Sequence, residues 1–175
     1  MSVSKKHIQG KDIVVFFRNE TKNPDAKARY LGFQLDFTLS REKQSEVVEF
    51  KGGSKNLNTG EEVSASLASQ LYQTDDENLA TWRELEKIYE EDDLLGLIIA
   101  DISNGEGEIE TIYTQGLLTT FEISAPQDGT AELSAEYNID GKPQRGNDIL
   151  TPEMIEEIEA IQYLHRKIDE TGSAG

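Results

Sequence analysis

Three glutamates alternate along one short stretch of the sequence, at Glu106, Glu108 and Glu110. If this stretch is a strand, the three carboxylates share one face, because successive side chains of a strand point to opposite sides. Paired carboxylates of this kind hydrolyse glycosides or hold calcium. A solvated strand face carries the same pattern, and we adopt this second interpretation.

The other reactive residue types do not combine into a catalytic motif. His7 lies in a polar N-terminal segment and His165 near the end of an expected helix, and neither has a Ser or Cys nucleophile motif beside it. Gly105 and Gly107 lack the third glycine and the following helix of a dinucleotide-binding fingerprint. The sequence has no cysteine, so disulfides and thiolate metal sites are excluded. We therefore expect no enzyme activity, no cofactor and no metal.

Length and composition favour a single domain with its own core. The chain has 175 residues, of which 36% are hydrophobic. Its longest apolar run, Leu94 to Ala100, is far too short to cross a bilayer. Residues 1–10 lack the apolar segment of a signal peptide, so we expect neither export nor membrane association.

The charge of the chain is strongly negative and unevenly distributed. The net charge is −17. Residues 1–30 hold seven Lys or Arg against three acids, whereas residues 75–93 hold nine acids against two basic residues. Such a surface repels nucleic acid, which argues against ordinary DNA or RNA binding. The opposite signs of the two segments permit head-to-tail contacts between subunits.

Seven stretches have the apolar pattern of β-strands. Ile13 to Phe17 is continuously apolar, which indicates a strand covered on both faces, and other stretches alternate with a period of two. Short turns join several of them. This pattern predicts a mainly β (α+β) fold, a two-sheet antiparallel β-sandwich or barrel with one packed helix. The expected strands are 12–18, 31–39, 61–72, 94–102, 108–113, 117–124 and 131–139.

Two helices are expected, one inside this domain and one after it. Thr74 to Glu77 forms a capping box, and Leu79, Trp82, Leu85, Ile88 and Tyr89 recur at helical spacing, which predicts a helix over 75–91. Thr151 and Pro152 open a second helix, whose apolar stripe needs a partner in its own sandwich or in a neighbouring subunit. The stripe is Ile155, Ile158, Ile161, Leu164 and Ile168. The chain thus divides into an N-terminal arm (1–10), a β-sandwich domain (11–150) and a C-terminal helix and tail (151–175).

Residues 40–62 are too many and too polar to be a simple turn between two strands. A tight hairpin needs only two to five residues, and longer connections are usually functional or disordered. Two extended halves of such a loop would reach roughly 35 Å. Its apolar residues Val47, Val48, Phe50 and Leu57 are costly to expose, so we expect them to be covered. They could also fold back on their own domain.

Four segments together resemble the major tail protein of long-tailed, non-contractile bacteriophages (siphophages), the subunit of the tail tube. Most of the region from residue 9 to about 150 is covered, and the family's Lys-Asp-Gly in the projecting loop is replaced here by Phe50-Lys51-Gly52-Gly53. The segments are Gln9-Gly10-Lys11-Asp12 before the first strand, Phe33-Gln34 with Thr38-Leu39-Ser40-Arg41, Tyr113-Thr114-Gln115-Gly116 before a strand containing Thr119, and Asn138 to Gly146 around Gly141-Lys142-Pro143-Gln144.

The resemblance implies a structural virion protein whose copies close into six-membered rings that stack into a tail tube. The protruding loop would reach the next ring, and DNA would pass through a negatively charged lumen without specific binding. The implied partners are further copies of the chain, the tape measure protein and the tail terminator and tip proteins, with assembly in the host bacterial cytoplasm. The expected inter-ring contacts are Val47, Val48, Phe50, Lys51, Gly52, Gly53 and Leu57. The expected lumen-lining residues are Glu106, Glu108, Glu110, Glu132 and Glu136.

Two alternatives remain open at this point. One is another tail component of the same fold, such as the tail terminator, which forms a single ring and does not polymerise. The other is a carbohydrate-binding β-sandwich module. That module predicts exposed aromatic residues on one face, whereas the one tryptophan, Trp82, belongs to the apolar stripe of a helix.

Overall fold

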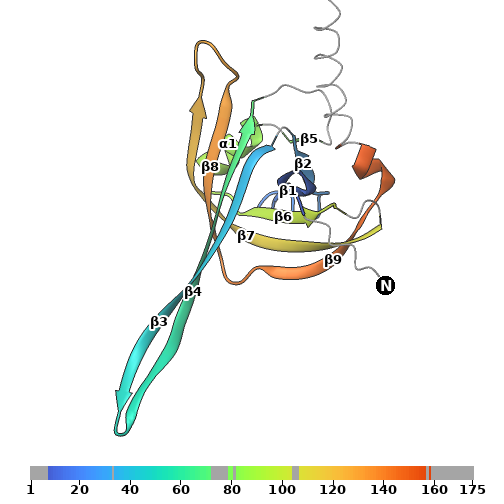
Figure 1. Ribbon diagram of the computed structural model, residues 1–175. Helices are drawn as coiled ribbons and strands as arrows, with labels where there is room; N and C mark the ends of the chain where they lie inside the picture. The colour runs from blue at the N-terminus through green and yellow to red at the C-terminus, as the bar shows by residue number, and fades with distance from the viewer. Residues whose placement is uncertain are drawn as a thin grey trace, which may run out of the picture.

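A single hydrogen-bonded sheet, bent around a core, makes up most of the protein (Figure 1). A computed structural model describes residues 8–32, 34–71, 79–80, 82–103, 107–156 and 158. No helix within these residues is both long and apolar enough to cross a bilayer. The predicted mainly β fold with one packed helix is confirmed.

The elements follow one another along the chain as short and long strands around one helix. A 3-10 turn, η1 (Gly10–Asp12), leads into the first strand, and a short helical segment at residues 152–156 follows the last one. Between them lie β1 (Ile13–Asn19), β2 (Arg29–Leu31), β3 (Gln34–Phe50), β4 (Gly53–Gln70), β5 (Leu79–Ala80), α1 (Trp82–Glu90), β6 (Leu95–Asp101), β7 (Gly107–Ser124), β8 (Glu132–Ile139) and β9 (Gln144–Leu150).

The strands pair in the order β3-β4-β8-β7-β6-β1-β2-β5, and β9 also pairs with β7. Every pairing is antiparallel except that of β2 with the short β5. β8 and β9 lie end to end along one edge of β7, where β8 pairs with residues 116–124 and β9 with residues 107–113. β6 occupies the opposite edge, along residues 111–116. β7 therefore connects the two halves of the sheet.

Two apolar clusters lie on opposite faces of β1 and β6. The first cluster takes Val15 and Phe17 from β1, together with buried residues of β4, β6, β8 and α1. The second takes Val14 and Phe16, together with residues of β6, β7 and β9 and with Ile158. Because neighbouring residues of a strand point to opposite faces, a run of apolar residues is what such a strand requires. The prediction that this strand is covered on both faces is confirmed.

The helix α1 covers the first cluster, but it is shorter than predicted. Leu85 and Ile88 are buried there, and the ring of Tyr89 stacks on Phe121 of β7 at 6.0 Å. Arg29 of β2 holds the helix through a two-pronged ion pair with Glu84. The helix begins at Trp82 and not at residue 75. Leu79, expected in its apolar stripe, belongs to β5, and the predicted capping box lies outside the described residues.

Several strand boundaries also differ from the predictions. The expected strand 31–39 is divided between β2 and β3, and a shift in register between Gln34 and Asp36 leaves Leu35 exposed. The expected strands 108–113 and 117–124 are one 18-residue strand, β7, with a bulge between Leu118 and Thr120. β9 was not predicted, because all its residues except Leu150 are exposed and it lacks an apolar alternation.

The segment after β9 begins as the sequence predicted. The backbone N–H of Met154 donates to Thr151 Oγ1 at 3.3 Å, so Thr151 is the N-cap. Ile158 is buried in the second cluster, and Ile155 packs against it. The start of the predicted apolar stripe is therefore covered by the chain's own sheet. Ile161, Leu164 and Ile168 lie outside the described residues.

Gly116 allows β7 and β8 to approach each other closely, which gives a first prediction. It pairs with Leu95 on one side and with Ile139 on the other, and a Cβ at this position would lie 1.8 Å from the backbone oxygen of Asn138. We expect Gly116→Ala to lower the free energy of unfolding of the unassembled chain by about 3 kcal/mol, since the backbones must separate. Urea unfolding monitored by circular dichroism measures this change.

Gly60→Ala is the matched control, because Gly60 also lies in a strand and its added Cβ would meet no atom within 4 Å. Equal effects of the two substitutions would show that loss of glycine, and not the close approach, determines the stability.

Candidate assembly surfaces

The outer part of the β3–β4 hairpin projects from the body as a long two-stranded arm (Figure 1). We define the arm as residues 41–62, because β4 pairs with β8 only from Val63 onward. Pairing between β3 and β4 continues without a loop to Phe50 and Gly53, and every residue from 40 to 60 is exposed. The expected protruding loop 40–62 is therefore a β-hairpin, and its projection from the sheet is as predicted.

The tip of the arm is a two-residue turn formed by Lys51 and Gly52. Gly52 has φ of +107°, a conformation that disfavours any side chain with a Cβ. The pairing of Phe50 with Gly53 across this turn fixes which residues share a face of the hairpin. The tip is thus a tight turn of defined geometry, and the positive φ at position 52 accounts for the glycine there.

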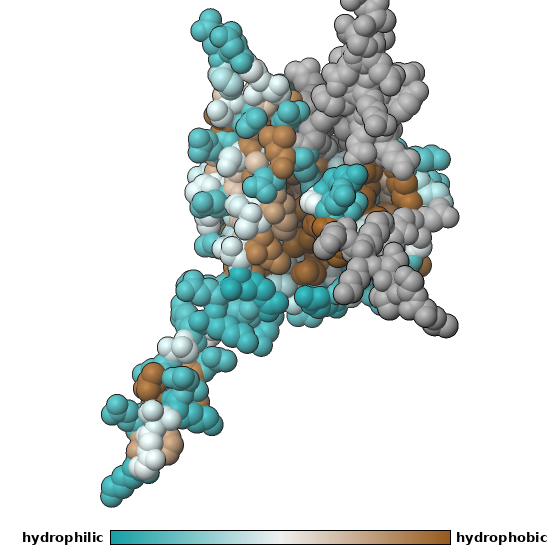
Figure 2. All heavy atoms as spheres, in the orientation of Figure 1, coloured by the Kyte–Doolittle hydropathy of each residue, from teal (hydrophilic) through white to brown (hydrophobic). Residues whose placement is uncertain are grey.

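The apolar residues of the arm are concentrated on one of its two faces. Cross-strand partners point to the same side. Val48 and Phe50 alternate along β3, and Leu57, which pairs with Glu46, points to the side that they share. Their exposed fractions are 40%, 59% and 44%. Val47 lies on the other face, opposite Asn56. Figure 2 shows hydrophobic (brown) patches on the otherwise hydrophilic arm.

An ion pair across the two strands holds the root of the arm. The guanidinium of Arg41 donates from Nε to Glu61 Oε1 at 2.7 Å and from a terminal nitrogen to Glu61 Oε2 at 3.1 Å. This two-pronged hydrogen bonding lowers the pKa of the Glu61 carboxyl and raises that of Arg41. Planar pairing of this kind restricts the two side chains and fixes their relative orientation.

A polar face covers β3, β4, β8 and the second half of β7 on the side away from the first cluster. It contains no lysine or arginine, since residues 34–40, 63–70, 114–124 and 132–139 have none. We call it the acidic face. By strand register its residues are Asp36, Thr38, Ser40, Ser64, Ser66, Ala68, Gln70, Leu117, Thr120, Glu122, Glu132, Ser134, Glu136 and Asn138.

The predicted lumen-lining glutamates divide between the two faces of the sheet. Glu132 and Glu136 are exposed on the acidic face. Glu108 and Glu110 are exposed on the opposite side of β7, the side to which Leu118 points. Glu110 also accepts from the guanidinium of Arg145 at 2.6 Å, which offsets its charge. Glu106 lies outside the described residues.

The first residue of β3, Gln34, fastens this strand to the opposite end of the sheet. Its Oε1 accepts from the N–H of Val15 at 3.2 Å, and its Nε2 donates to the carbonyls of Val15 and Leu31 at 2.9 and 2.7 Å. The side-chain amide thus takes the place of a missing strand beside β1. Sequence patterns did not reveal this role, because no local pattern reports a contact between residues that lie 19 positions apart.

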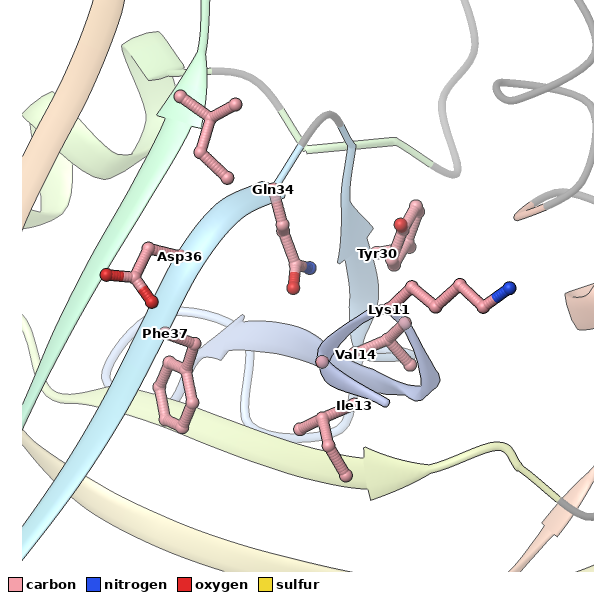
Figure 3. Close-up of a pocket in the computed structure, with 9 residues that line it drawn as sticks. Lys11, Ile13, Val14, Tyr30, Gln34, Asp36 and Phe37 are labelled. Atoms are coloured by element: carbon pink, nitrogen blue, oxygen red, sulfur yellow. The ribbon is translucent and has the colours of Figure 1, made fainter. Parts of the chain in front are cut away.

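Beside Gln34 lies a hollow of about 400 Å³, which Figure 3 shows in close-up. Ile13, Val14 and Phe37 provide its apolar part, and Leu35, 49% exposed, extends it at the surface. In Figure 3, Lys11 and Asp36 lie on opposite sides of these apolar residues. We call this site the β3-start hollow. In Figure 2, apolar side chains gather over the same region of the body.

A polar network explains another of the sequence motifs. Glu20 Oε1 accepts from Tyr113 Oη at 2.7 Å and from Arg18 Nε at 2.8 Å, and Gln115 Nε2 donates to Tyr113 Oη at 2.6 Å. Burial and the hydrogen bond to Glu20 raise the pKa of Tyr113, so the hydroxyl remains a donor at neutral pH. The carboxylate of Glu20 lies directly over Gly96, where a Cβ would be 2.4 Å from Glu20 Oε1. The network ties β1, β6 and β7 together and has a structural role.

The described residues contain no arrangement suited to a metal ion. Among them, no group of three or more His, Asp or Glu is placed to hold one. His7 and His165 lie outside the described part of the chain. The surfaces with a distinctive structure are therefore the arm, the acidic face and the β3-start hollow.

Comparisons with known proteins agree on one class. Residues 7–145 match the family described as "Phage tail tube protein". The chain is 26% identical over 159 residues to a putative tail protein of Staphylococcus phage phiMR25, covering 87% of this chain and 78% of that protein. Its fold is similar to the SPP1 tail tube subunit, with a TM-score of 0.70, 13% identity and coverage of 86% and 84% of the two chains.

A second structural likeness is to the tail of an empty gene transfer agent particle, refined with C6 symmetry. The TM-score is 0.58 and the identity 14%, with 82% of this chain and 98% of that chain covered. At these identities, the two structural comparisons establish a shared fold.

The Gln34 contacts give a second prediction. Gln34→Met keeps the length of the side chain but leaves the N–H of Val15 without its partner, so we expect a loss of about 1–2 kcal/mol of unfolding free energy. Hydrogen exchange of the Val15 amide should accelerate, because its protecting acceptor is gone. Gln144→Met, at an exposed position of β9, is the control. An unchanged exchange rate at Val15 in Gln34→Met would contradict the assigned role.

Proposed function

This chain belongs to the phage tail tube protein family, and from that premise we propose that its copies close into six-membered rings that stack into a conduit for DNA. The family makes it a structural component of the virion tail. The observation that carries the proposal is that one sheet bears two features: an arm with apolar residues on one side, and an acidic face without lysine or arginine. No catalytic role is included.

We assign closure of the ring to the two free edges of the sheet half that bears the acidic face. β3 is the last strand of the sheet, and its outer edge has no strand partner among the described residues. β7 beyond Gly116 pairs with β8 on one side only. Free edges readily take up another strand, so β3 of one copy and β7 of the next could extend one sheet around the ring. The C6 symmetry of the gene transfer agent tail supports six copies.

We place the acidic face in the lumen, apart from Asp36, which lies at the start of β3 beside the β3-start hollow. Six copies would carry a net charge of roughly −100, and duplex DNA carries one charge per about 1.7 Å. Like charges repel over about 8 Å at physiological salt, so a cation-free wall offers DNA no site at which to adhere. Glu132 and Glu136 lie on this face, whereas Glu108 and Glu110 do not, and we therefore assign the lumen to the first pair.

We assign the arm to contact between rings. Three apolar side chains on one face of the hairpin are exposed to solvent, which is unfavourable in a free molecule. Contact with another copy would cover them. The contact residues are those expected from the sequence: Val47, Val48, Phe50, Lys51, Gly52, Gly53 and Leu57. Of these, Val48, Phe50 and Leu57 share the apolar face and would provide most of the buried area.

Further partners follow from the same proposal. A tube of fixed length needs a tape measure protein inside it and terminator and tip proteins at its ends, and these are the partners we infer from the family. They remain unassigned to particular residues.

The lumen assignment predicts an effect of charge reversal. Particles whose tails carry Glu132→Lys with Glu136→Lys should eject DNA about tenfold more slowly, because lysines facing the lumen would bind phosphates. The delay should diminish as salt is added. Single-particle ejection assays with a DNA-binding dye measure both effects.

Glu108→Lys with Glu110→Lys is the matched control, since it makes the same charge change on the other face of the sheet. If this variant slows ejection and the Glu132 and Glu136 variant does not, the lumen assignment is wrong.

The arm assignment predicts a face-specific defect in assembly. Val48→Ser with Leu57→Ser removes apolar groups from one face and should abolish tubes while leaving the body folded, because every residue from 40 to 60 is exposed and none belongs to the core. Val47→Ser, on the other face, should have a smaller effect. Negative-stain electron microscopy distinguishes tubes, single rings and monomers. Tubes of normal length and yield from the double variant would contradict the assignment.

A further inference from the structure

The acceptor for the arm can be sought at the opposite end of the same strand. β3 begins beside the β3-start hollow and ends at the arm tip, and Phe50 follows Asp36 by 14 positions. At about 3.3 Å per residue this separates the two sites by about 46 Å. The tip of an arm therefore cannot reach the hollow of its own chain. A copy displaced along the direction of β3 by no more than this length would bring its hollow to the tip.

The chemistry of the tip matches that of the hollow. The tip presents Lys51 directly after Phe50, a base beside an aromatic ring, whereas Glu49 points to the other face of the arm. The hollow has an apolar floor with Lys11 on one side and Asp36 on the other (Figure 3). Neither Asp36 nor Lys51 forms an ion pair with another described residue. Opposite charges around an apolar centre fix the register of a contact.

We propose that the β3-start hollow is the receptor for the arm tip of a copy in the adjacent ring, with Phe50 against Ile13, Leu35 and Phe37. This inference rests on the proposed function and adds the site at which the arm binds. Lys51 then faces Asp36. A contact between different surfaces of identical subunits is head-to-tail, and it propagates into an open stack if it does not close on itself.

A second apolar hollow on the body is a poorer candidate for binding the arm tip. It has about 200 Å³, between β9 and the segment after it, and its lining includes Ile98, Ile109 and the exposed Ile149. It lies beside β9 and not at the start of β3, so axial displacement along β3 does not bring it to a tip. It serves as the comparison site.

Because the chain has no native cysteine, disulfide trapping can test the contact without background. Leu35→Cys with Phe50→Cys, oxidised in assembled tubes, should give a ladder of covalent multimers on a non-reducing gel. Ile149→Cys with Phe50→Cys, and each single variant, should give monomer or at most dimer. Tubes that form normally but show no ladder with Leu35→Cys, or a ladder with Ile149→Cys, would overturn the receptor assignment and leave the proposed function intact.

Charge reversal tests the same contact without changing Phe50, and it therefore applies even if the Phe50→Cys variants do not assemble. Asp36→Lys and Lys51→Asp should each reduce the tube yield about tenfold, and their combination should restore most of it, since the pair is reconstituted with opposite polarity. A combined variant as defective as the single variants would overturn the inference. A wild-type chain that forms no tubes under any condition would instead refute the proposed function.

Discussion

The hydrogen-bonded ladder between β3 and β4 is the interaction on which the architecture depends. Its inner part is integrated into the sheet through the pairing of β4 with β8, and its outer part has no other support. The same two strands therefore contribute to the core and hold a projection away from it. The ladder keeps the arm extended, and the ion pair between Arg41 and Glu61 stabilises the point where the two parts meet. A flexible loop of equal length would lose much more conformational entropy when its tip bound a partner.

The half of the sheet that bears the acidic face can leave that face free, because its buried apolar residues pack into the first cluster on the other side. In β4 and β8, the apolar residues Val63, Ala65 and Leu67 and Leu133, Ala135 and Tyr137 all point inward. The buried hydroxyl of Tyr137 in β8 donates to the carbonyl of Leu95 in β6 at 2.7 Å, which joins these two strands across the core. The outward residues are then free of any packing requirement. This freedom allows that face to be small, polar and acidic without loss of stability.

Sequence patterns predicted the parts of the fold that depend on local alternation. β6, β8 and the doubly covered β1 follow from such patterns, as does the N-cap at Thr151. What they missed depends on contacts distant in sequence. The exposure of Leu35 comes from a register shift against β4, and Leu79 is held as a strand by pairing with β2, which overrides its helical spacing. Nothing in the sequence could show that Glu108 and Glu110 lie on one face of the sheet and Glu132 and Glu136 on the other, because this division depends on how β7 and β8 pair.

The asymmetry of the arm would give the proposed stack a direction. Because the projection leaves the body at one end only, the two termini of that stack would differ, one bearing uncovered Phe50 side chains and the other uncovered β3-start hollows. Growth of the proposed stack at its two termini would then use different surfaces of the subunit. The orientation of the whole filament would be set by the side of the sheet from which one hairpin extends.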